Sequence, residues 1–418
     1  MNTSVSSLSR SHLLFSPFIS VSSGSFSTRS YFSKLHFSYS TSSFLFSTSN
    51  LFHYRIDKSK FSYFNDKSIY LTGLNQFQNL FNKTLEYSEE GSLEINECVF
   101  QRTKSQSSGG AIMFDSQNAF LSIKSSGFML SYAQQNGGAI SFNGAGINIS
   151  NSCFLGCLAL SAGQAFEVSG SSVKGYYEFT TFDQCSPLRT KGNSVALFLK
   201  YGYQEINNIN ETSNHVNDMG ACLCVAYNSF FSLMFSNFVG CTGGNCFWLH
   251  PLKPDDLFMN CNIVSNKANN DTGIFMFENS SVVFMGFTFI GNDATVYFMG
   301  GSLSLSQCIL DVKLKNSLFS NCKHTYPDTL FGAQRLRPRP VPIFITWGCW
   351  AMGAPSPTPS QSLVPIEAAL EEATMGITVL VVLLLIGFST GFLAYYLTGK
   401  TGEVLADSKM ETLTPSNK

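Results

Sequence analysis

The sequence is short of charged residues. They make up 13% of its 418 residues and leave a formal net charge of −1, whereas an average soluble domain carries about 25%. Binding to nucleic-acid phosphates needs a stripe of Lys or Arg, and the chain contains none. The composition therefore excludes nucleic acid as a partner.

Motifs of nucleophilic and phosphate chemistry are missing as well. There is no G-x-S-x-G element and no G-x-x-x-x-G-K-S/T loop. Lyases and hydrolases of polysaccharides need convergent carboxylates, but the one adjacent acidic pair between Phe100 and Cys322 is Asp255-Asp256. We expect no catalytic residue, no cofactor and no enzyme activity. The alternative is a membrane-tethered, pectate-lyase-like enzyme in which Asp255 and Asp256 act.

Paired cysteines at zinc-finger spacing are also absent. The closest approaches, Cys222-Leu-Cys224 and Cys153-Phe-Leu-Gly-Cys157, lack the second pair of ligands that tetrahedral zinc needs. The sequence therefore predicts no metal site. Twelve cysteines lie between Cys98 and Cys349, and disulfides are permitted if that part of the chain faces an oxidising compartment.

One long uncharged segment is present. Residues 375–397 read MGITVLVVLLLIGFSTGFLAYYL, which is long enough to cross about 30 Å of hydrocarbon as a helix. Acidic residues precede it and lysines follow it, so the positive-inside rule places residues 398–418 in the cytoplasm. We expect a single-pass plasma-membrane protein with an extracellular N-terminus and lipid contacts along residues 375–397. A buried core helix is the alternative.

Gly387 and Gly391 form a G-x-x-x-G pair within this segment. Such a pair could let two helices pack closely and form a dimer, and chance glycines are the plain alternative.

The N-terminal region has two interpretations. Residues 1–23, with Arg10 ahead of the apolar run Leu13–Val21, resemble a signal peptide, and the lack of acidic residues before Asp57 is also typical of an organellar presequence. Residues 24–70 are rich in Ser and Phe, and their alternation over Phe37–Ser47 indicates a strand.

A repeat fills the middle of the chain. An apolar residue followed three positions later by Cys, Ser, Thr or Asn recurs in steps of 25 to 30 residues. These pairs are Phe100/Thr103, Phe128/Ser131, Phe154/Cys157, Phe182/Cys185, Ile209/Thr212, Phe238/Cys241, Ile263/Asn266, Phe289/Asn292 and Phe319/Cys322. A glycine turn and an apolar strand follow at a near-fixed offset, as in Gly109–Phe114 and Gly137–Phe142.

Apolar residues within each unit alternate as they do in a strand, and a unit of this size cannot bury its own apolar face. Stacked units would share one core. The sequence therefore predicts an all-β protein, a right-handed parallel β-helix of about nine coils over residues 85–335. In it the Phe residues stack from coil to coil, and the small polar residues form an internal ladder in which Asn amides bond to the neighbouring coils. Cys157 and Cys185 would be neighbours in that ladder, as a disulfide or as a stacked reduced pair.

The ends of a β-helix must be covered. Apolar residues at helical spacing predict an amphipathic capping helix over residues 71–84. The Pro- and Ser-rich residues 336–374 predict an extended stalk between the β-helix and the membrane segment.

The G-G-A-I elements at Gly109–Ile112 and Gly137–Ile140, together with F-x-x-N/C elements such as Phe289–Asn292 and Phe319–Cys322, resemble the repeats of chlamydial polymorphic membrane proteins. They also resemble membrane-anchored β-helix surface proteins of protists such as trichomonads. The resemblance covers about Phe100 to Cys322 and implies a parallel β-helix on a cell surface and, more loosely, adhesion. The bacterial family ends in an outer-membrane barrel, whereas this chain ends in one apolar segment, so a eukaryotic surface fits better.

Acceptor sites for N-glycosylation agree with that location. N-x-S/T occurs at Asn82, Asn148, Asn210, Asn270 and Asn279. We expect an adhesin that binds a host cell, matrix or glycan. A purely structural surface protein is equally compatible with the sequence.

Overall fold

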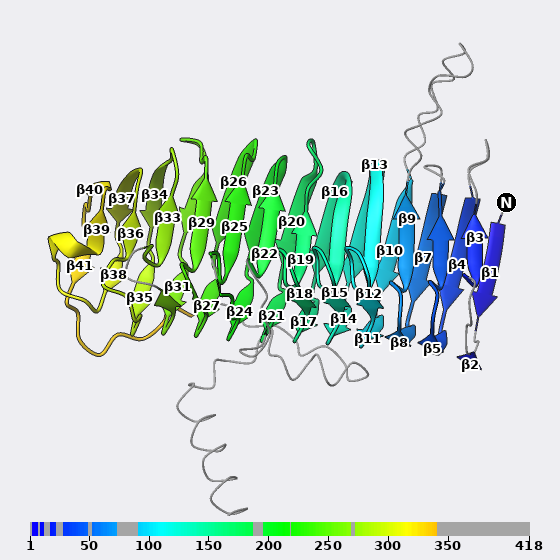
Figure 1. Cartoon of the computed structure of the whole chain (residues 1–418). Coiled ribbons are helices and arrows are strands. Elements are labelled where there is room, and N and C mark those ends of the chain that lie inside the picture. The colour runs from blue at the N-terminus through cyan, green and yellow to red at the C-terminus, as the bar shows by residue number, and fades with distance from the viewer. Residues whose placement is uncertain are drawn as a thin grey trace, which may run out of the picture. The chain divides into compact units, whose positions relative to one another are not determined.

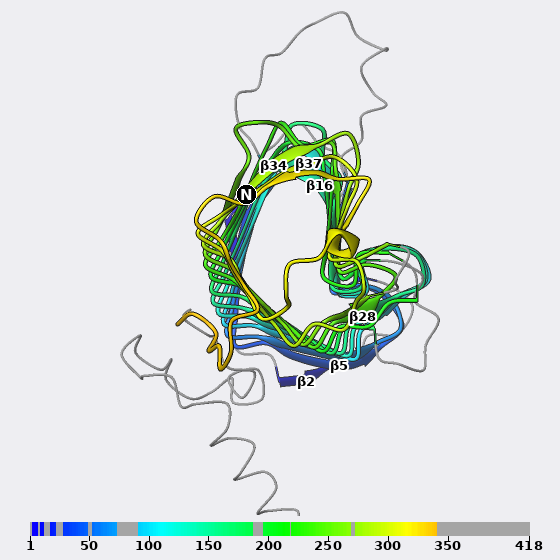
Figure 2. The same ribbon diagram turned by 90° about the vertical axis from the view of Figure 1, so that its left-hand side faces the viewer.

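The computed structural model describes residues 2–6, 9–11, 17–21, 28–48, 52–72, 91–186, 195–217, 219–268 and 272–340. They form a right-handed parallel β-solenoid with about nine turns in the predicted repeat region. Successive turns stack into a rod (Figure 1) and nearly superimpose when viewed along its axis (Figure 2). The predicted all-β fold is confirmed.

Two large sheets run along the rod. The 23-stranded sheet consists of β1 (Asn2–Ser6), β3 (Ile19–Val21), β4 (Thr28–Ser33), β6 (Leu45–Ser47), β7 (Phe52–Asp57), β9 (Ile69–Thr72), β10 (Ser92–Asn96), β13 (Ile112–Lys124), β16 (Ile140–Ser150), β19 (Phe166–Val168), β20 (Lys174–Glu178), β22 (Leu197–Lys200), β23 (Tyr203–Asn207), β25 (Leu223–Ala226), β26 (Phe230–Met234), β29 (Phe247–His250), β30 (Leu257–Met259), β33 (Phe275–Phe277), β34 (Ser281–Met285), β36 (Phe298–Met299), β37 (Ser302–Ser306), β39 (Phe319–Ser320) and β40 (Lys323–Thr325). The 13-stranded sheet consists of β2 (Ser9–Ser11), β5 (His36–Ser40), β8 (Lys60–Phe64), β11 (Val99–Gln101), β14 (Gly127–Met129), β17 (Cys153–Leu155), β21 (Thr181–Asp183), β24 (Asn210–Thr212), β27 (Asn237–Val239), β31 (Asn262–Val264), β35 (Thr288–Ile290), β38 (Ile309–Leu310) and β41 (Leu330–Phe331).

Short elements complete the coils. Three strands form one small sheet, two form another, and one 3-10 helix lies near the end of the rod: β12 (Lys104–Ser105), β15 (Tyr132–Ala133), β18 (Leu158–Ala159), β28 (Thr242–Gly243), β32 (Lys267–Ala268) and η2 (Asn316–Leu318).

Each coil contributes two segments to the 23-stranded sheet and one strand to the 13-stranded sheet. In β13 two consecutive segments of the 23-stranded sheet form one continuous strand, whose register against β16 shifts between Ser116 and Phe120. From β19 and β20 onward these two segments are separate strands. All described strand pairs are parallel, so residues at equivalent places in successive coils become neighbours, for example Phe100 beside Phe128.

Single residues in the left-handed conformation turn the chain from the 23-stranded sheet to the 13-stranded sheet. Glu97, Ser125 and Asn151 adopt φ values of 52°, 50° and 47° at this corner in successive coils. A small residue follows the corner: Ser126 Oγ accepts from the Cys98 amide (3.0 Å), and Ser152 Oγ accepts from the Ser126 amide (3.2 Å). These side-chain bonds satisfy amides that the bend takes out of the strand ladder.

The solenoid begins before the predicted repeat region. Strands of residues 28–72 pair in the same two sheets as the later coils, for example β7 with β10 and β8 with β11. The strand expected over Phe37–Ser47 is present as β5 and β6. Within residues 1–23, expected to hold a signal peptide, β1, β2 and β3 pair with β4, β5 and β6.

Several other predicted segments lie wholly or partly outside the described residues. For the capping helix over residues 71–84, the described part ends at Thr72, which closes strand β9. Residues 375–397, Gly387, Gly391 and the tail are not among those described. In the part of the chain that the structure describes, no helix is long and apolar enough to cross a membrane.

The described start of the predicted stalk, residues 336–340, lies against the solenoid. The Arg339 amide donates to Asn262 Oδ1 (2.8 Å) and Asn262 Nδ2 donates to the Arg339 carbonyl (2.9 Å). The Asn262 side chain therefore pairs with the passing backbone as a strand neighbour would, and the chain turns back beside the 13-stranded sheet (Figure 1).

Phe128 tests whether the stacked Phe rings hold the rod together. Its ring is fully buried between Phe100 and Phe154, so Phe128→Ala should leave a cavity and cost about 3–5 kcal/mol of unfolding free energy. The control is Leu130→Ala, since Leu130 is 43% exposed and should lose far less. The measurement is the urea midpoint of the full chain followed by circular dichroism. Equal midpoints for the two variants would contradict this account of the core.

Candidate functional site

The predicted Phe row exists in the middle of the rod. Ring centroids of Phe100 and Phe128 lie 4.9 Å apart, those of Phe128 and Phe154 4.8 Å, and those of Phe154 and Phe182 4.9 Å, all stacked. Phe61 extends the row one coil earlier, 5.1 Å from Phe100. Parallel in-register pairing of β8, β11, β14, β17 and β21 places these rings on one line.

A carboxylic acid interrupts this row. Glu211 pairs with Phe182 on one side and with Phe238 on the other, so it occupies the place of a Phe. The repeat pair Ile209/Thr212 is therefore corrected to Glu211/Asn214. The sequence analysis placed Ile209 in the row because the motif has an apolar residue at this position. Glu211 occupies the position instead and is fully buried although its side chain is acidic.

The last repeat pair also needs correction. Phe289 pairs with Leu310 in the 13-stranded sheet, whereas Phe319 pairs with Phe298 in the other sheet. Cys322 is only partly buried and lies beyond β39. The final coils are shorter than the others, since Cys308 bonds to Thr329 only 21 residues further on, and this shortening shifts the register.

The small polar row is an internal hydrogen-bond ladder. Thr103 Oγ1 donates to Ser131 Oγ (2.9 Å). Further along, Asn266 Oδ1 accepts from the Cys241 amide (2.9 Å), and Asn292 Oδ1 accepts from the Asn266 amide (3.0 Å). The amide groups also donate: Asn266 Nδ2 to the Phe238 carbonyl and Asn292 Nδ2 to the Ile263 carbonyl, both at 2.8 Å.

Cys157 and Cys185 are neighbours in this ladder as free, fully buried thiols. The structure therefore has the reduced stacked pair and not the disulfide. Ten of the described cysteines carry free thiols, namely Cys98, Cys157, Cys185, Cys222, Cys224, Cys241, Cys246, Cys261, Cys308 and Cys322.

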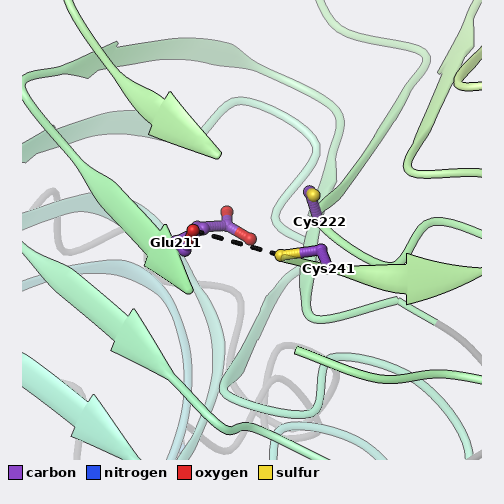
Figure 3. A group of neighbouring side chains, drawn as sticks. All are labelled: Glu211, Cys222 and Cys241. Atoms are coloured by element: carbon purple, nitrogen blue, oxygen red, sulfur yellow. Dashed lines mark hydrogen bonds between the residues drawn. The ribbon is translucent and has the colours of Figure 1, made fainter. Parts of the chain in front are cut away.

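A cluster of metal-ligating side chains surrounds Glu211 inside the rod. A carboxylate oxygen of Glu211 and the sulfur atoms of Cys222 and Cys241 all lie within 4.8 Å of one another. Figure 3 shows the three side chains converging from separate segments, with the Cys241 thiol also 4.0 Å from the Glu211 carbonyl oxygen. Cys246 lies beside this group, because its carbonyl accepts a bond from the Cys222 amide (2.9 Å) and its thiol lies 4.0 Å from the Cys241 carbonyl oxygen. We call Glu211, Cys222, Cys241 and Cys246 the Glu/Cys cluster.

The two carboxylate oxygens of Glu211 differ in their hydrogen bonding. Asn214 Nδ2 donates to Oε2 (3.2 Å), while Oε1 has no hydrogen-bond partner among the described residues. Burial raises the pKa of the Glu211 carboxyl well above its usual value, the nearby Cys241 thiol raises this pKa further, and the Asn214 bond opposes the shift. An unpaired, fully buried carboxylate oxygen is costly and calls for an explanation.

Sequence reasoning predicted no metal site because it looked for closely spaced pairs of ligands. In the Glu/Cys cluster the side chains come from two successive coils: Glu211 from β24 and Cys222 from the turn before β25 of one coil, and Cys241 and Cys246 from the turns after β27 and before β29 of the next. Only the register between coils brings such positions together. The one sequence feature that could have indicated the cluster is Glu211, an acidic residue in an otherwise apolar row.

The outer face of these same coils carries aromatic side chains in two rows. In one row the ring centroids of Tyr176 and Tyr203 lie 5.8 Å apart and those of Tyr203 and Phe230 4.7 Å. In the other, Tyr227 lies 5.9 Å from Tyr201 and 5.0 Å from His250. We call these six residues the aromatic face.

Polar groups border the aromatic face. Tyr203 Oη donates to Glu205 Oε2 (3.1 Å). Trp248 Nε1 donates to Glu278 Oε1 (2.9 Å), and His250 Nδ1 lies 3.2 Å from Glu278 Oε2. Carboxylates therefore stand in fixed positions beside the half-buried rings of Tyr203, Trp248 and His250.

Asp255 and Asp256 are the acidic pair on which the enzyme alternative depends, and the Asp256 carboxylate holds the backbone of its own loop. Asp256 Oδ1 accepts from the Phe231 amide (2.7 Å) and Oδ2 from the Lys253 amide (2.7 Å). Asp255 is exposed. Among the described residues, the one group of three or more His, Cys, Asp or Glu side chains close enough to share an ion contains neither aspartate.

The glycosylation candidates lie in different surroundings. Asn148 and Asn279 are exposed, whereas Asn210 is 8% exposed. Asn82 and Asn270 lie outside the described residues.

Comparison of the chain with known protein families, with characterised proteins and with solved structures finds no match.

Asn266 tests the internal ladder. Asn266→Ala removes the partners of the Cys241 amide and the Phe238 carbonyl, and each unsatisfied buried group costs about 1–3 kcal/mol. The control is Asn143→Ala, since Asn143 bonds to Asp115 on the outer face and should cost well under half as much. Urea midpoints of the two variants measure the difference, and a loss at Asn266 no larger than at Asn143 would refute the role of the ladder.

Thiol reactivity tests the burial of the cysteines. Burial raises the pKa of Cys98 and Cys261 to about 12 each, so at neutral pH the thiolate fraction is on the order of 10⁻⁵. Iodoacetamide should leave both unmodified in the folded chain and modify them after denaturation. Cys322 is partly exposed and should react first, as mapped by peptide mass spectrometry. Equal labelling of Cys98 and Cys322 in the folded chain would contradict the structure.

Proposed function

We propose that this chain is a single-pass cell-surface protein whose extracellular solenoid binds glycans of a host cell or matrix. Residues 375–397 would anchor it in the plasma membrane, and the tail would lie in the cytoplasm. The resemblance of its repeats to polymorphic membrane proteins and to protist surface proteins points the same way. The observation that carries the proposal is the aromatic face.

Exposed aromatic side chains seldom gather in rows unless they contact something. Tyr227 is 53% exposed and Tyr176 42%, and contiguous apolar surface of this kind marks interaction sites. The rows follow the rod axis because each ring lies on the coil next to its neighbour. Such a platform matches a linear chain of sugar rings, whose apolar C–H faces pack on aromatic rings.

The bordering polar groups fit the same ligand class. Glu205 and Glu278 are held by Tyr203 and Trp248, so their remaining acceptor capacity is directed beside the rings at little entropic cost. Sugar hydroxyls donate to such carboxylates. A protein partner would more often be met by a larger apolar core.

Substitutions in the aromatic face test the proposal. Tyr203→Ala and Phe230→Ala should each weaken binding of the full chain to its glycan at least about tenfold, because central aromatic anchors commonly contribute more than about 1.4 kcal/mol. Tyr39→Ala is the control, since Tyr39 is 59% exposed and stacks on Tyr63 in an N-terminal coil and should leave binding unchanged. A glycan array identifies the ligand, and surface plasmon resonance gives the affinities.

The proposal fails if the folded wild-type chain binds no glycan on the array, or if both variants bind as the wild type does. Binding to purified matrix protein that survives enzymatic removal of its glycans would also overturn the assignment to sugar.

A further inference from the structure

We propose that the Glu/Cys cluster binds one zinc ion inside the rod, through a carboxylate oxygen of Glu211 and the sulfur atoms of Cys222, Cys241 and Cys246. This proposal does not rest on the proposed glycan binding, and none of the four residues belongs to the aromatic face.

The choice of residues supports a ligand site. Positions equivalent to Glu211 in the adjacent coils hold Phe182 and Phe238, so an apolar side chain would complete the row there. A carboxylate in its place loses stacking and hydration and gains one hydrogen bond, from Asn214. An ion bound at Oε1, which lacks a hydrogen-bond partner among the described residues, would offset that loss.

The geometry fits tetrahedral zinc. Zinc–sulfur bonds of about 2.3 Å place tetrahedral ligand atoms about 3.8 Å apart, and the ligand atoms of Glu211, Cys222 and Cys241 already lie within 4.8 Å of one another. Small side-chain rotations therefore suffice. Cys246 stands in register with Cys222 on the next coil, with the Cys222 amide bonded to the Cys246 carbonyl (2.9 Å). Its thiol lies outside the group of three ligand atoms within 4.8 Å of one another and would move in to complete the four ligands.

The donor set fits the same ion. Thiolates select soft or borderline ions, and three sulfurs with one oxygen exclude magnesium and calcium, which prefer oxygen. Four anionic ligands around a divalent ion leave the same formal charge as the common four-cysteine zinc sites. The Asn214 bond to Oε2 would orient the ligating carboxylate from behind, as outer-shell partners of metal ligands do. With no open position, the ion would be structural.

Register explains how such a site could help the fold. Glu211 and Cys222 belong to one coil and Cys241 and Cys246 to the next, so the ion would tie these two coils together. The interruption of the Phe row would then become a cross-link between coils, and removal of the ion would leave a buried acid among thiols.

Metal analysis of the full chain tests the proposal. Wild-type protein purified from zinc-supplemented cells and dialysed should retain one zinc per chain by mass spectrometry of the elements. Cys241→Ser and Glu211→Leu should retain none. Cys261→Ser is the matched control, because Cys261 is an equally buried free cysteine outside the cluster, and it should retain the ion.

A second measurement needs no variant and stands if the substitutions prevent folding. X-ray absorption at the zinc edge of the wild type should show three sulfur neighbours near about 2.3 Å and one oxygen near about 2.0 Å. Cobalt substitution should give the thiolate charge-transfer band of a tetrahedral site.

Four results would overturn the proposal: folded wild-type protein that retains no zinc, a disulfide from Cys222 to Cys241 or Cys246 in peptide mapping, zinc retained equally by Cys241→Ser, or a zinc environment of nitrogen and oxygen alone.

Discussion

Parallel, in-register pairing of successive coils is the constraint on which the rest of the structure depends. It gives every inward side chain two neighbours of equivalent position, one coil before and one coil after. Phe128 between Phe100 and Phe154 is the plainest case. No coil has a core of its own, so the hydrophobic energy belongs to the contacts between coils. The same pairing carries the polar ladder, where the Asn266 side chain bonds to the Cys241 amide and the Phe238 carbonyl of the preceding coil, while the Asn266 amide donates to Asn292 of the following coil.

The sequence predicted the solenoid because this constraint repeats along the chain. Phe followed three residues later by a small polar residue marks a strand and a corner, and eight of the nine predicted first positions lie in or directly before strands of the 13-stranded sheet. The errors have physical causes. At Ile209 the true place is taken by Glu211, which no apolar motif can find, and at Phe319 shorter coils shift the phase. A Ser or Cys stands two positions before several of these Phe residues, such as Ser126 before Phe128, and marks the same corner, but the sequence analysis did not use it.

The site was harder to predict than the fold because its residues meet across coils. Cys222, Cys241 and Glu211 have no common spacing, and a search for zinc-finger pairs misses them. Backbone conformation at the corners was equally hidden, since residues as different as Glu97, Ser125 and Phe235 adopt the left-handed turn. Position in the coil, and not residue type, imposes that conformation at a cost of roughly 1–2 kcal/mol each.

Alternation along each strand separates the two proposed sites while keeping them in the same coils. Tyr203 faces outward and Ile206 inward on β23, so the outer residues can change without disturbing the core. The aromatic face and the Glu/Cys cluster nevertheless share coils, since Tyr203 and Glu211 belong to one coil and Phe230 and Cys241 to the next. The distances between the rings of the aromatic face depend on the distances between the coils that carry them. An ion that fixed these coils to one another would therefore also fix the distances between the rings, and a rigid platform binds with less loss of entropy than a mobile one.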